Sequence, residues 1–181
     1  MTTTPTPCRL TGDYVLDTTR TRIGFAARHT IGPKVRGQFD EFTGRAYLDG
    51  DDPSKSRVEL TIWAASIRTG NPQRDRLLRD RFLRTHDHPA MAFATTAVRQ
   101  ITQTVFELTG DLTIRGKTCP VTLHLERAGT EHDPAGTTRL RLRGGATLNR
   151  KDWGLHSPAA AGLIRKEVTL ELDVAVNRRP C

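Results

Sequence analysis

The stretch Phe106-Glu107-Leu108-Thr109-Gly110-Asp111-Leu112-Thr113-Ile114 alternates apolar or small residues with polar ones at every step. Successive side chains of a β-strand point to opposite faces, so this period of two predicts a strand with one buried and one solvated face. The same alternation recurs in 57–62, 139–148 and 168–176, and turn-forming residues, as at 49–53, bound the segments. We count about eight to ten such segments, enough to close a barrel with room for a small ligand.

One segment departs from this alternation and predicts a helix. The stretch 69–72 has the features of a helix start, with Asn71 as the N-cap and Pro72 at the first helical position. The helix should end before Pro89, because the residue before a proline disfavours the helical conformation. On a barrel this helix either covers the interior as a lid or simply closes one end. The apolar residues that share its inner face at helical spacing are Leu77, Leu78 and Phe82.

The charge balance is basic, with 28 Lys and Arg against 20 Asp and Glu and a formal net charge of +8. Such a balance can indicate binding to nucleic acid or to a membrane surface. The basic residues are spread along the chain, however, and the densest run, 74–84, is interrupted by Asp75 and Asp80. The few aromatic residues fall mostly on the apolar phase of the strands rather than among basic ones. We therefore interpret the charge as a solvated surface and expect no nucleic-acid partner.

The sequence shows no signal for export or for the membrane. No apolar stretch approaches the length of a transmembrane helix, and residues 1–8 lack the charged start and apolar core of a secretory signal. We expect a cytoplasmic protein without stable membrane insertion. The odd number of cysteines (Cys8, Cys119 and Cys181) and the lack of a C-x-x-C pair argue against a disulfide framework or a structural zinc site. Cys8 and Cys181 could meet near the termini, but we expect reduced thiols.

The organisation is that of one domain. A chain of 181 residues suits a single barrel that buries its own core. We place the barrel domain at 13–177, with a flexible N-terminal tail at 1–12 and a C-terminal tail at 178–181.

Several motifs together resemble one known family, the YceI family. They occur in the family order and span about 14 to 176. They are a histidine-ending strand at 23–29 followed by V-x-G-x-F at 35–39, the helix region at 66–82, P-x-x-x-F at 89–93, G-x-L-T-I-x-G-x-T at 110–118, and a block at 149–155 similar to N-R-x-D-F-G.

The resemblance implies an all-β fold, namely a lipocalin-like up-and-down antiparallel β-barrel of about eight strands with one short helix. It also implies an elongated apolar ligand inside the barrel, such as a polyisoprenoid, an isoprenoid quinone or a fatty-chain amphiphile, and a homodimer. No cofactor is implied.

The helix region departs from the family pattern. Leu77 stands where the family usually has a histidine, and Arg81 stands where it usually has an acidic residue. One residue is also missing between Leu78 and Phe82. We interpret these differences as a changed helix face beside the mouth of the pocket.

His29 is the one candidate for a catalytic group, because an imidazole titrates near neutral pH. It either binds a ligand head group, acts as a general base, or orders the adjacent turn through its own hydrogen bonds. The remaining candidates for ligand contact are large apolar residues that either line a pocket or fill the core. The full set of expected ligand-binding residues is Phe25, His29, Phe39, Trp63, Leu78, Phe82, Phe93 and Trp153.

Other polar residues have structural interpretations. Arg74 and Asp75 either form an ion pair that fixes the helix, which we favour, or contact the ligand. The polar residues at 149–152 (Asn149, Arg150 and Asp152) suit a turn after their strand. The stretch 86–88 contains two histidines and an aspartate but lacks a third histidine or cysteine nearby, so we expect no metal.

Three function classes remain. The first is a carrier, storage or sequestering protein for a long apolar molecule, without catalysis. The second is a cytosolic enzyme of the cyclase or isomerase type that uses the same pocket with His29. A nucleic-acid-binding barrel ranks last, because charge is its only support.

Overall fold

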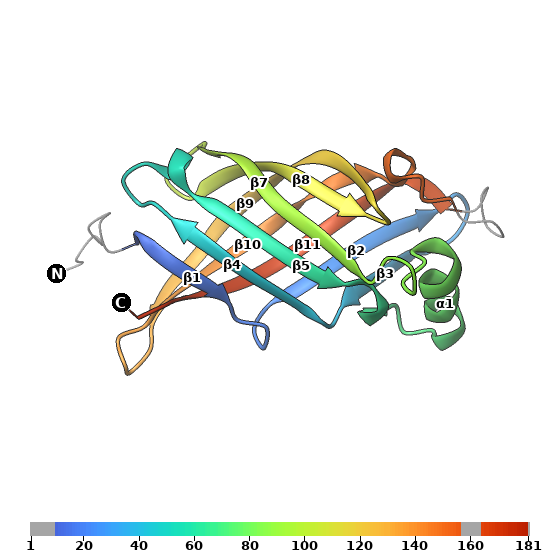
Figure 1. The fold of residues 1–181 in the computed structure, drawn as a ribbon, viewed down its shortest axis with the longest axis horizontal. Coiled ribbons are helices and arrows are strands. Elements are labelled where there is room, and N and C mark those ends of the chain that lie inside the picture. The colour runs from blue at the N-terminus through green and yellow to red at the C-terminus, as the bar shows by residue number, and fades with distance from the viewer. Residues whose placement is uncertain (1–9, 157–163, 181) are drawn as a thin grey trace.

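The chain folds into a long β-barrel with a helical segment at one end, in a computed structural model that describes residues 10–156 and 164–180 (Figure 1). The helix is α1, Pro72–Leu77. The strands are β1 (Gly12–Leu16), β2 (Arg22–His29), β3 (Lys34–Phe39), β4 (Phe42–Leu48), β5 (Arg57–Trp63), β6 (Ile67–Arg68), β7 (Ala90–Gln100), β8 (Val105–Ile114), β9 (Lys117–His132), β10 (Thr138–Asn149) and β11 (Ile164–Arg178).

Eight of these strands close the barrel in the order β1-β4-β5-β7-β8-β9-β10-β11, with β11 returning to β1. Every neighbouring pair is antiparallel, and the closing pair sets Tyr14 opposite Arg178 and Leu16 opposite Val176. The lipocalin-like antiparallel barrel with one short helix is therefore confirmed. Most of the expected tail at 1–12 lies outside the described residues, as do Cys8 and Cys181, whereas Cys119 is a free thiol.

A branch of the sheet extends the wall at the helix end. The first part of β11 pairs with β2, for example Leu170 with Phe25, and β3 and β6 continue outward from β2. Because β6 has only two residues and forms the edge of this branch, the wall stops there. The helical segment, which follows β6 after three residues, lies at the same end of the barrel as β3 (Figure 1).

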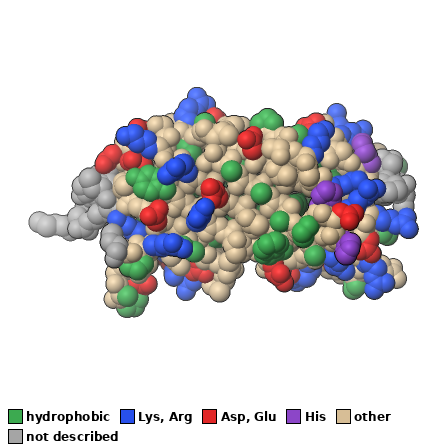
Figure 2. All heavy atoms as spheres, viewed as in Figure 1, with side chains coloured by type: hydrophobic (Ala, Val, Ile, Leu, Met, Phe, Trp, Pro, Cys, Tyr) green, Lys and Arg blue, Asp and Glu red, His purple; other side chains and the backbone are tan. Residues whose placement is uncertain are grey.

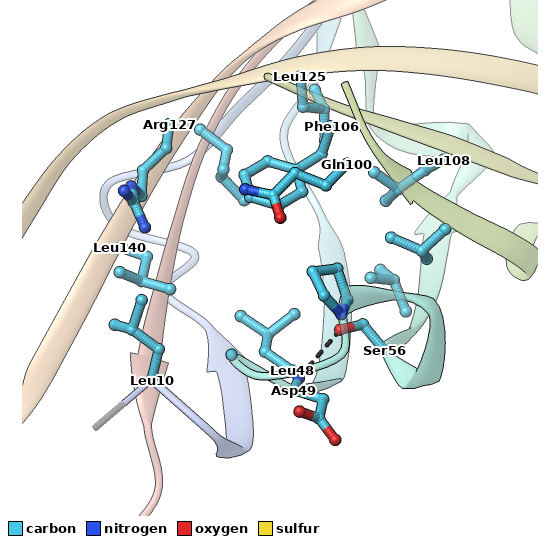
Figure 3. Close-up of a pocket in the computed structure, with 15 residues that line it drawn as sticks. Leu10, Leu48, Asp49, Ser56, Gln100, Phe106, Leu108, Leu125, Arg127 and Leu140 are labelled. Atoms are coloured by element: carbon cyan, nitrogen blue, oxygen red, sulfur yellow. Dashed lines mark hydrogen bonds between the residues drawn. The ribbon is translucent and has the colours of Figure 1, made fainter. Parts of the chain in front are cut away.

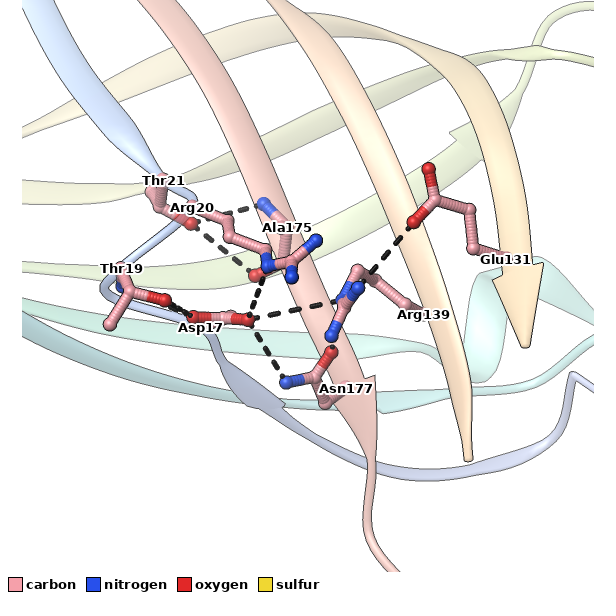
Figure 4. A network of polar contacts seen from close by, with 8 residues as sticks. All are labelled: Asp17, Thr19, Arg20, Thr21, Glu131, Arg139, Ala175 and Asn177. Carbon is pink, nitrogen blue, oxygen red and sulfur yellow. Dashed lines mark hydrogen bonds and ion pairs between the residues drawn. The ribbon is translucent and has the colours of Figure 1, made fainter. Parts of the chain in front are cut away.

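The turn between β1 and β2 is held by a polar network (Figure 4). The carboxylate of Asp17 accepts hydrogen bonds from the hydroxyl and amide of Thr19 and from the amide of Asn177. It also lies 3.7 Å from Arg20 and 3.9 Å from Arg139. The pKa of Asp17 is lowered, mainly because the Thr19 hydroxyl donates to the charged form. The network therefore ties β10 and β11 to the point where the chain passes from β1 to β2.

The helix begins as the sequence predicts. The side chain of Asn71 accepts hydrogen bonds from the backbone N–H groups of Gln73 and Arg74, and Pro72 is the first helical residue. The α-helix is shorter than expected, because its second half, Leu78–Phe82, is a single π-helical turn. Leu78 and Phe82 pack against the core, as expected, and Leu77, although 46% exposed, lines the interior cavity with them.

On the visible face, basic side chains lie mainly toward the two ends of the barrel, interspersed with acidic ones, and histidines gather at the helix end (Figure 2). This distribution agrees with a solvated surface. Among the described residues, no helix combines the length and the apolar character needed to span a membrane.

Candidate ligand-binding site

A cavity of about 390 Å³ occupies the barrel interior at the end where α1 lies. Its walls are side chains of β2, β3, β5, β6, β7, β8, β9, β10 and β11, together with the helical segment. The residues of the alternating stretch 106–114 that reach it are Leu112 and Ile114, both buried. The interior is therefore hollow at this end and predominantly apolar, which is the usual character of a small-molecule site.

Two phenylalanines of adjacent strands form one side of the cavity. The ring centroids of Phe25 and Phe39 are 5.7 Å apart with the planes tilted by 46°. The Phe25 ring lies over Gly37, where a Cβ atom would come within 2.8 Å of Cε1 of that ring. The glycine of the V-x-G-x-F motif thus leaves room for the aromatic residue of the neighbouring strand.

The structure brings together seven of the eight residues expected to contact ligand. Trp63 is not among the lining residues, and its side chain is 42% exposed. Trp153 is buried, and its indole N–H donates to the carbonyl of Leu112 at 2.9 Å. The seven that line the cavity are Phe25, His29, Phe39, Leu78, Phe82, Phe93 and Trp153.

The polar side of the cavity carries positive charge. Among the described residues, four arginines and one histidine line it, and no Asp or Glu does. None of these arginines forms an ion pair within the described residues, and the segments 1–9 and 157–163 contain no Asp or Glu in sequence. An anion at this place would meet unneutralised guanidinium groups. The basic lining residues are Arg28, His29, Arg74, Arg81 and Arg150.

His29 lies at the end of β2, half-buried, opposite Ile164 of β11. Within the described part of the chain, no hydrogen bond of its imidazole is present, so nothing there ties it to the adjacent turn. It is one of the residues that line the cavity.

The expected ion pair between Arg74 and Asp75 is wrong. Both residues bind Thr69 instead: Arg74 donates from Nε to the Thr69 hydroxyl at 2.7 Å and from Nη2 to the Thr69 carbonyl at 2.9 Å. Asp75, which is buried, accepts from the amide and the hydroxyl of Thr69. Consecutive residues on a helix point in different directions, and Thr69 lies between the two side chains. The Thr69 hydroxyl therefore positions Arg74 at the cavity.

Arg150 is a buried cation without a carboxylate partner in the described part of the chain. Its guanidinium donates to the carbonyls of Leu155 at 2.6 Å, Ile164 at 3.0 Å and Arg165 at 3.3 Å. It therefore joins the turn after β10 to the start of β11, while Asn149 caps the same turn by accepting from Lys151. This agrees with the turn-ordering role expected for 149–152 and adds contact with the cavity.

Sequence reasoning did not single out several lining residues. Leu60, Leu112 and Leu170 lie in the inward phase of the alternation, so their strand position was a usable signal. Arg28 had none, because exposed arginines occur throughout the chain, whereas Arg81 was marked only by its departure from the family pattern in the helix region. No three His, Cys, Asp or Glu side chains gather as metal ligands in the described residues.

Comparison with known proteins gives consistent matches. The family model described as the YceI-like domain matches residues 14–176. A UPF0312 protein of Shewanella denitrificans is 34% identical over 157 residues, covering 83% of this chain and 82% of that protein.

Solved structures share the fold at low sequence identity. Burkholderia cenocepacia BcnA superposes with a TM-score of 0.77 at 17% identity, covering 88% of this chain and 98% of that one. A polyisoprenoid-binding domain from Saccharophagus degradans, implicated in plant cell wall breakdown, superposes with a TM-score of 0.69 at 16% identity, covering 92% and 98%.

Proposed function

The chain belongs to the YceI-like family, and from that premise we propose that it binds one apolar chain inside the barrel, as a carrier, storage or sequestering protein. The observation that carries this proposal is the cavity of about 390 Å³ at the helix end. A void of this size lies in the range of ligand pockets and is far larger than the packing defects of an ordinary core. The Saccharophagus degradans neighbour is a polyisoprenoid-binding domain, and this supports the same ligand class.

The charge of the lining favours an amphiphile with an anionic head. Arg28, His29, Arg74 and Arg81 line the cavity together with apolar residues, and no carboxylate is among the described lining residues. A phosphate or carboxylate head would gain charge-assisted hydrogen bonds there, whereas a neutral quinone head would not use the charge. A prenyl phosphate or a fatty acid therefore fits this site better than a quinone.

The lining also favours binding over turnover. His29 is the one imidazole among the described lining residues, and none of these residues is a carboxylate that could act as a second acid–base group. Retention of a ligand requires only that its apolar chain is buried and that its head group pairs with the basic side chains.

The test is mass spectrometry of an organic extract from the purified protein. We expect one amphiphile per chain, and we expect it to be absent from Ala27→Phe, which places a ring inside the cavity. Ala92→Phe is the matched control, because Ala92 is exposed on β7. An extract from Ala27→Phe that holds as much amphiphile as the wild type would count against the cavity as the binding site.

The homodimer and the cytoplasmic location belong to the same proposal and rest on the sequence alone. Light scattering after size-exclusion chromatography measures the first, and cell fractionation measures the second.

A further inference from the structure

The described residues enclose a second cavity in the barrel interior. Besides the cavity at the helix end, a smaller one of about 140 Å³ lies at the opposite end (Figure 3). Leu48, Phe106, Leu125 and Leu140 are among its lining residues, and none of its lining residues also lines the larger cavity. The two spaces are therefore separated within the same barrel.

The division falls between neighbouring inward positions of the same strands. On β5, Val58 lines the small cavity and Leu60 the large one. On β9, Leu125 lines the small cavity and Leu123 the large one. Since inward residues on a strand are two positions apart, no further inward residue lies between the cavities at these strands, and the lining side chains themselves form a partition one layer thick.

Three large side chains fill this layer over two glycines. A Cβ atom on Gly110 would lie 2.6 Å from Cζ of Phe93, so the Phe93 ring takes the place of a side chain there. A Cβ atom on Gly44 would lie 3.3 Å from both Cδ2 of Leu16 and Cδ1 of Leu60. We call Leu16, Leu60 and Phe93 the waist of the barrel.

We propose that the waist limits the length of the bound chain to about fifteen or sixteen carbons, with Phe93 as the main length-determining residue. The proposal rests on the proposed function. An apolar cavity of about 150 Å³ holds one benzene, six carbons, so a cavity of about 390 Å³ holds roughly sixteen. A chain whose head lies at the basic residues would end against Phe93.

The ligand series that tests this uses the wild-type protein and prenyl monophosphates of ten, fifteen, twenty and forty carbons. Affinity, measured by isothermal titration, should rise by about tenfold or more from the ten-carbon to the fifteen-carbon chain as apolar surface is buried. The forty-carbon chain should bind about tenfold or more weakly than the fifteen-carbon one, because its excess length keeps its head away from the arginines.

Phe93→Ala is the matching variant, since it removes the ring between the cavities. It should bind the forty-carbon chain at least as tightly as the fifteen-carbon chain. Phe106→Ala, which makes the same change in the small cavity beyond the waist, should keep the wild-type preference. If Phe93→Ala does not fold, Leu16→Ala removes a different side chain of the same layer and takes its place. The wild-type ligand series tests the length limit without either variant.

The outcomes separate the inference from the proposed function. Equal or tighter wild-type binding of the forty-carbon chain would overturn the length limit and leave the function standing. An unchanged preference in a folded Phe93→Ala protein would overturn the role of Phe93. Failure of every prenyl phosphate to bind would contradict both the proposed function and the length limit.

Discussion

The ring of Phe93 occupies the space that a side chain on Gly110 would need, across two neighbouring strands of the barrel. Large side chains over glycines fill the middle of the interior, whereas the two ends remain hollow. The pair thus determines where the ligand cavity stops. The same contact is also part of the packing that stabilises the barrel.

Gly110→Ala should destabilise the protein. Its Cβ atom would lie 2.5 Å from the carbonyl oxygen of Ala94 and 2.6 Å from Phe93, so backbone and ring must both shift. We expect a loss of about 1–3 kcal/mol in the free energy of unfolding, measured with urea. Gly129→Ala is the control, because no atom of the described residues beyond its two chain neighbours lies within 4 Å of the Cβ atom it would add. Equal stability of the two variants would show that the Phe93–Gly110 contact is not tightly packed.

Charge reversal at the mouth should weaken the binding of anionic ligands only. We expect Arg28→Glu and Arg81→Glu each to reduce the affinity for farnesyl phosphate by about tenfold, because each removes a cation and adds a repelling charge. The affinity for farnesol, which has the same chain, should change little. Arg76→Glu is the control, since Arg76 is exposed on α1 and does not line the cavity. A parallel loss for farnesol would mean that these changes distort the cavity instead.

Arg150→Lys should destabilise the protein although it keeps the charge. One ammonium group cannot reproduce the planar set of donors to the carbonyls of Leu155, Ile164 and Arg165. We expect a loss of about 2–4 kcal/mol in urea unfolding, because buried carbonyls lose their donors. The same substitution at the exposed Arg143, 3.4 Å from Asp173, should change stability by less than about 0.5 kcal/mol. Comparable losses at both positions would contradict the role assigned to Arg150.

Asp17 should contribute to the loss of stability in acid. Its pKa is lower in the folded protein than the ordinary 3.8, so its contribution is present above that pH. The contribution disappears as the pH falls through the folded pKa. Asp17→Asn should therefore be less stable than the wild type at neutral pH, and the difference should shrink below about pH 4. Urea unfolding against pH measures this, with the exposed Asp111→Asn as control. A difference that stays constant with pH would argue against the network in Figure 4.

Much of the fold follows from the alternation and the helix cap. The period of two predicts the strands because one face of each lies in the interior, and Asn71 and Pro72 mark the start of the helix correctly. The same alternation also predicts where Trp63 lies: it shares its phase with Arg57, Glu59 and Thr61, and the structure leaves it exposed. We expected Trp63 to contact the ligand because it is aromatic, although its position in the strand predicts an outward side chain.

The remaining features depend on register, which periodicity alone does not supply. The Phe93–Gly110 contact joins β7 to β8 beside a register shift between Thr95 and Ala97, so no local pattern places the ring over the glycine. The extent of the cavity cannot be predicted from the alternation either. Leu108 and Leu112 follow the same pattern, but Leu108 lines the small cavity and Leu112 the large one. Thr69 binds both Arg74 and Asp75 through a turn whose geometry the sequence does not specify.

The measurement that tests the central claim most directly is quenching of Trp153 fluorescence by a chain-brominated sixteen-carbon fatty acid. The protein has two tryptophans, so Trp63→Phe leaves Trp153, in the cavity wall, as the only one. Bromine quenches tryptophan at short range, and an apolar chain inside the barrel should therefore quench Trp153 saturably, at one ligand per chain. The quenching should disappear in the Trp63→Phe, Ala27→Phe double variant. A folded protein whose Trp153 emission stays unchanged at saturating fatty acid would contradict binding in this cavity.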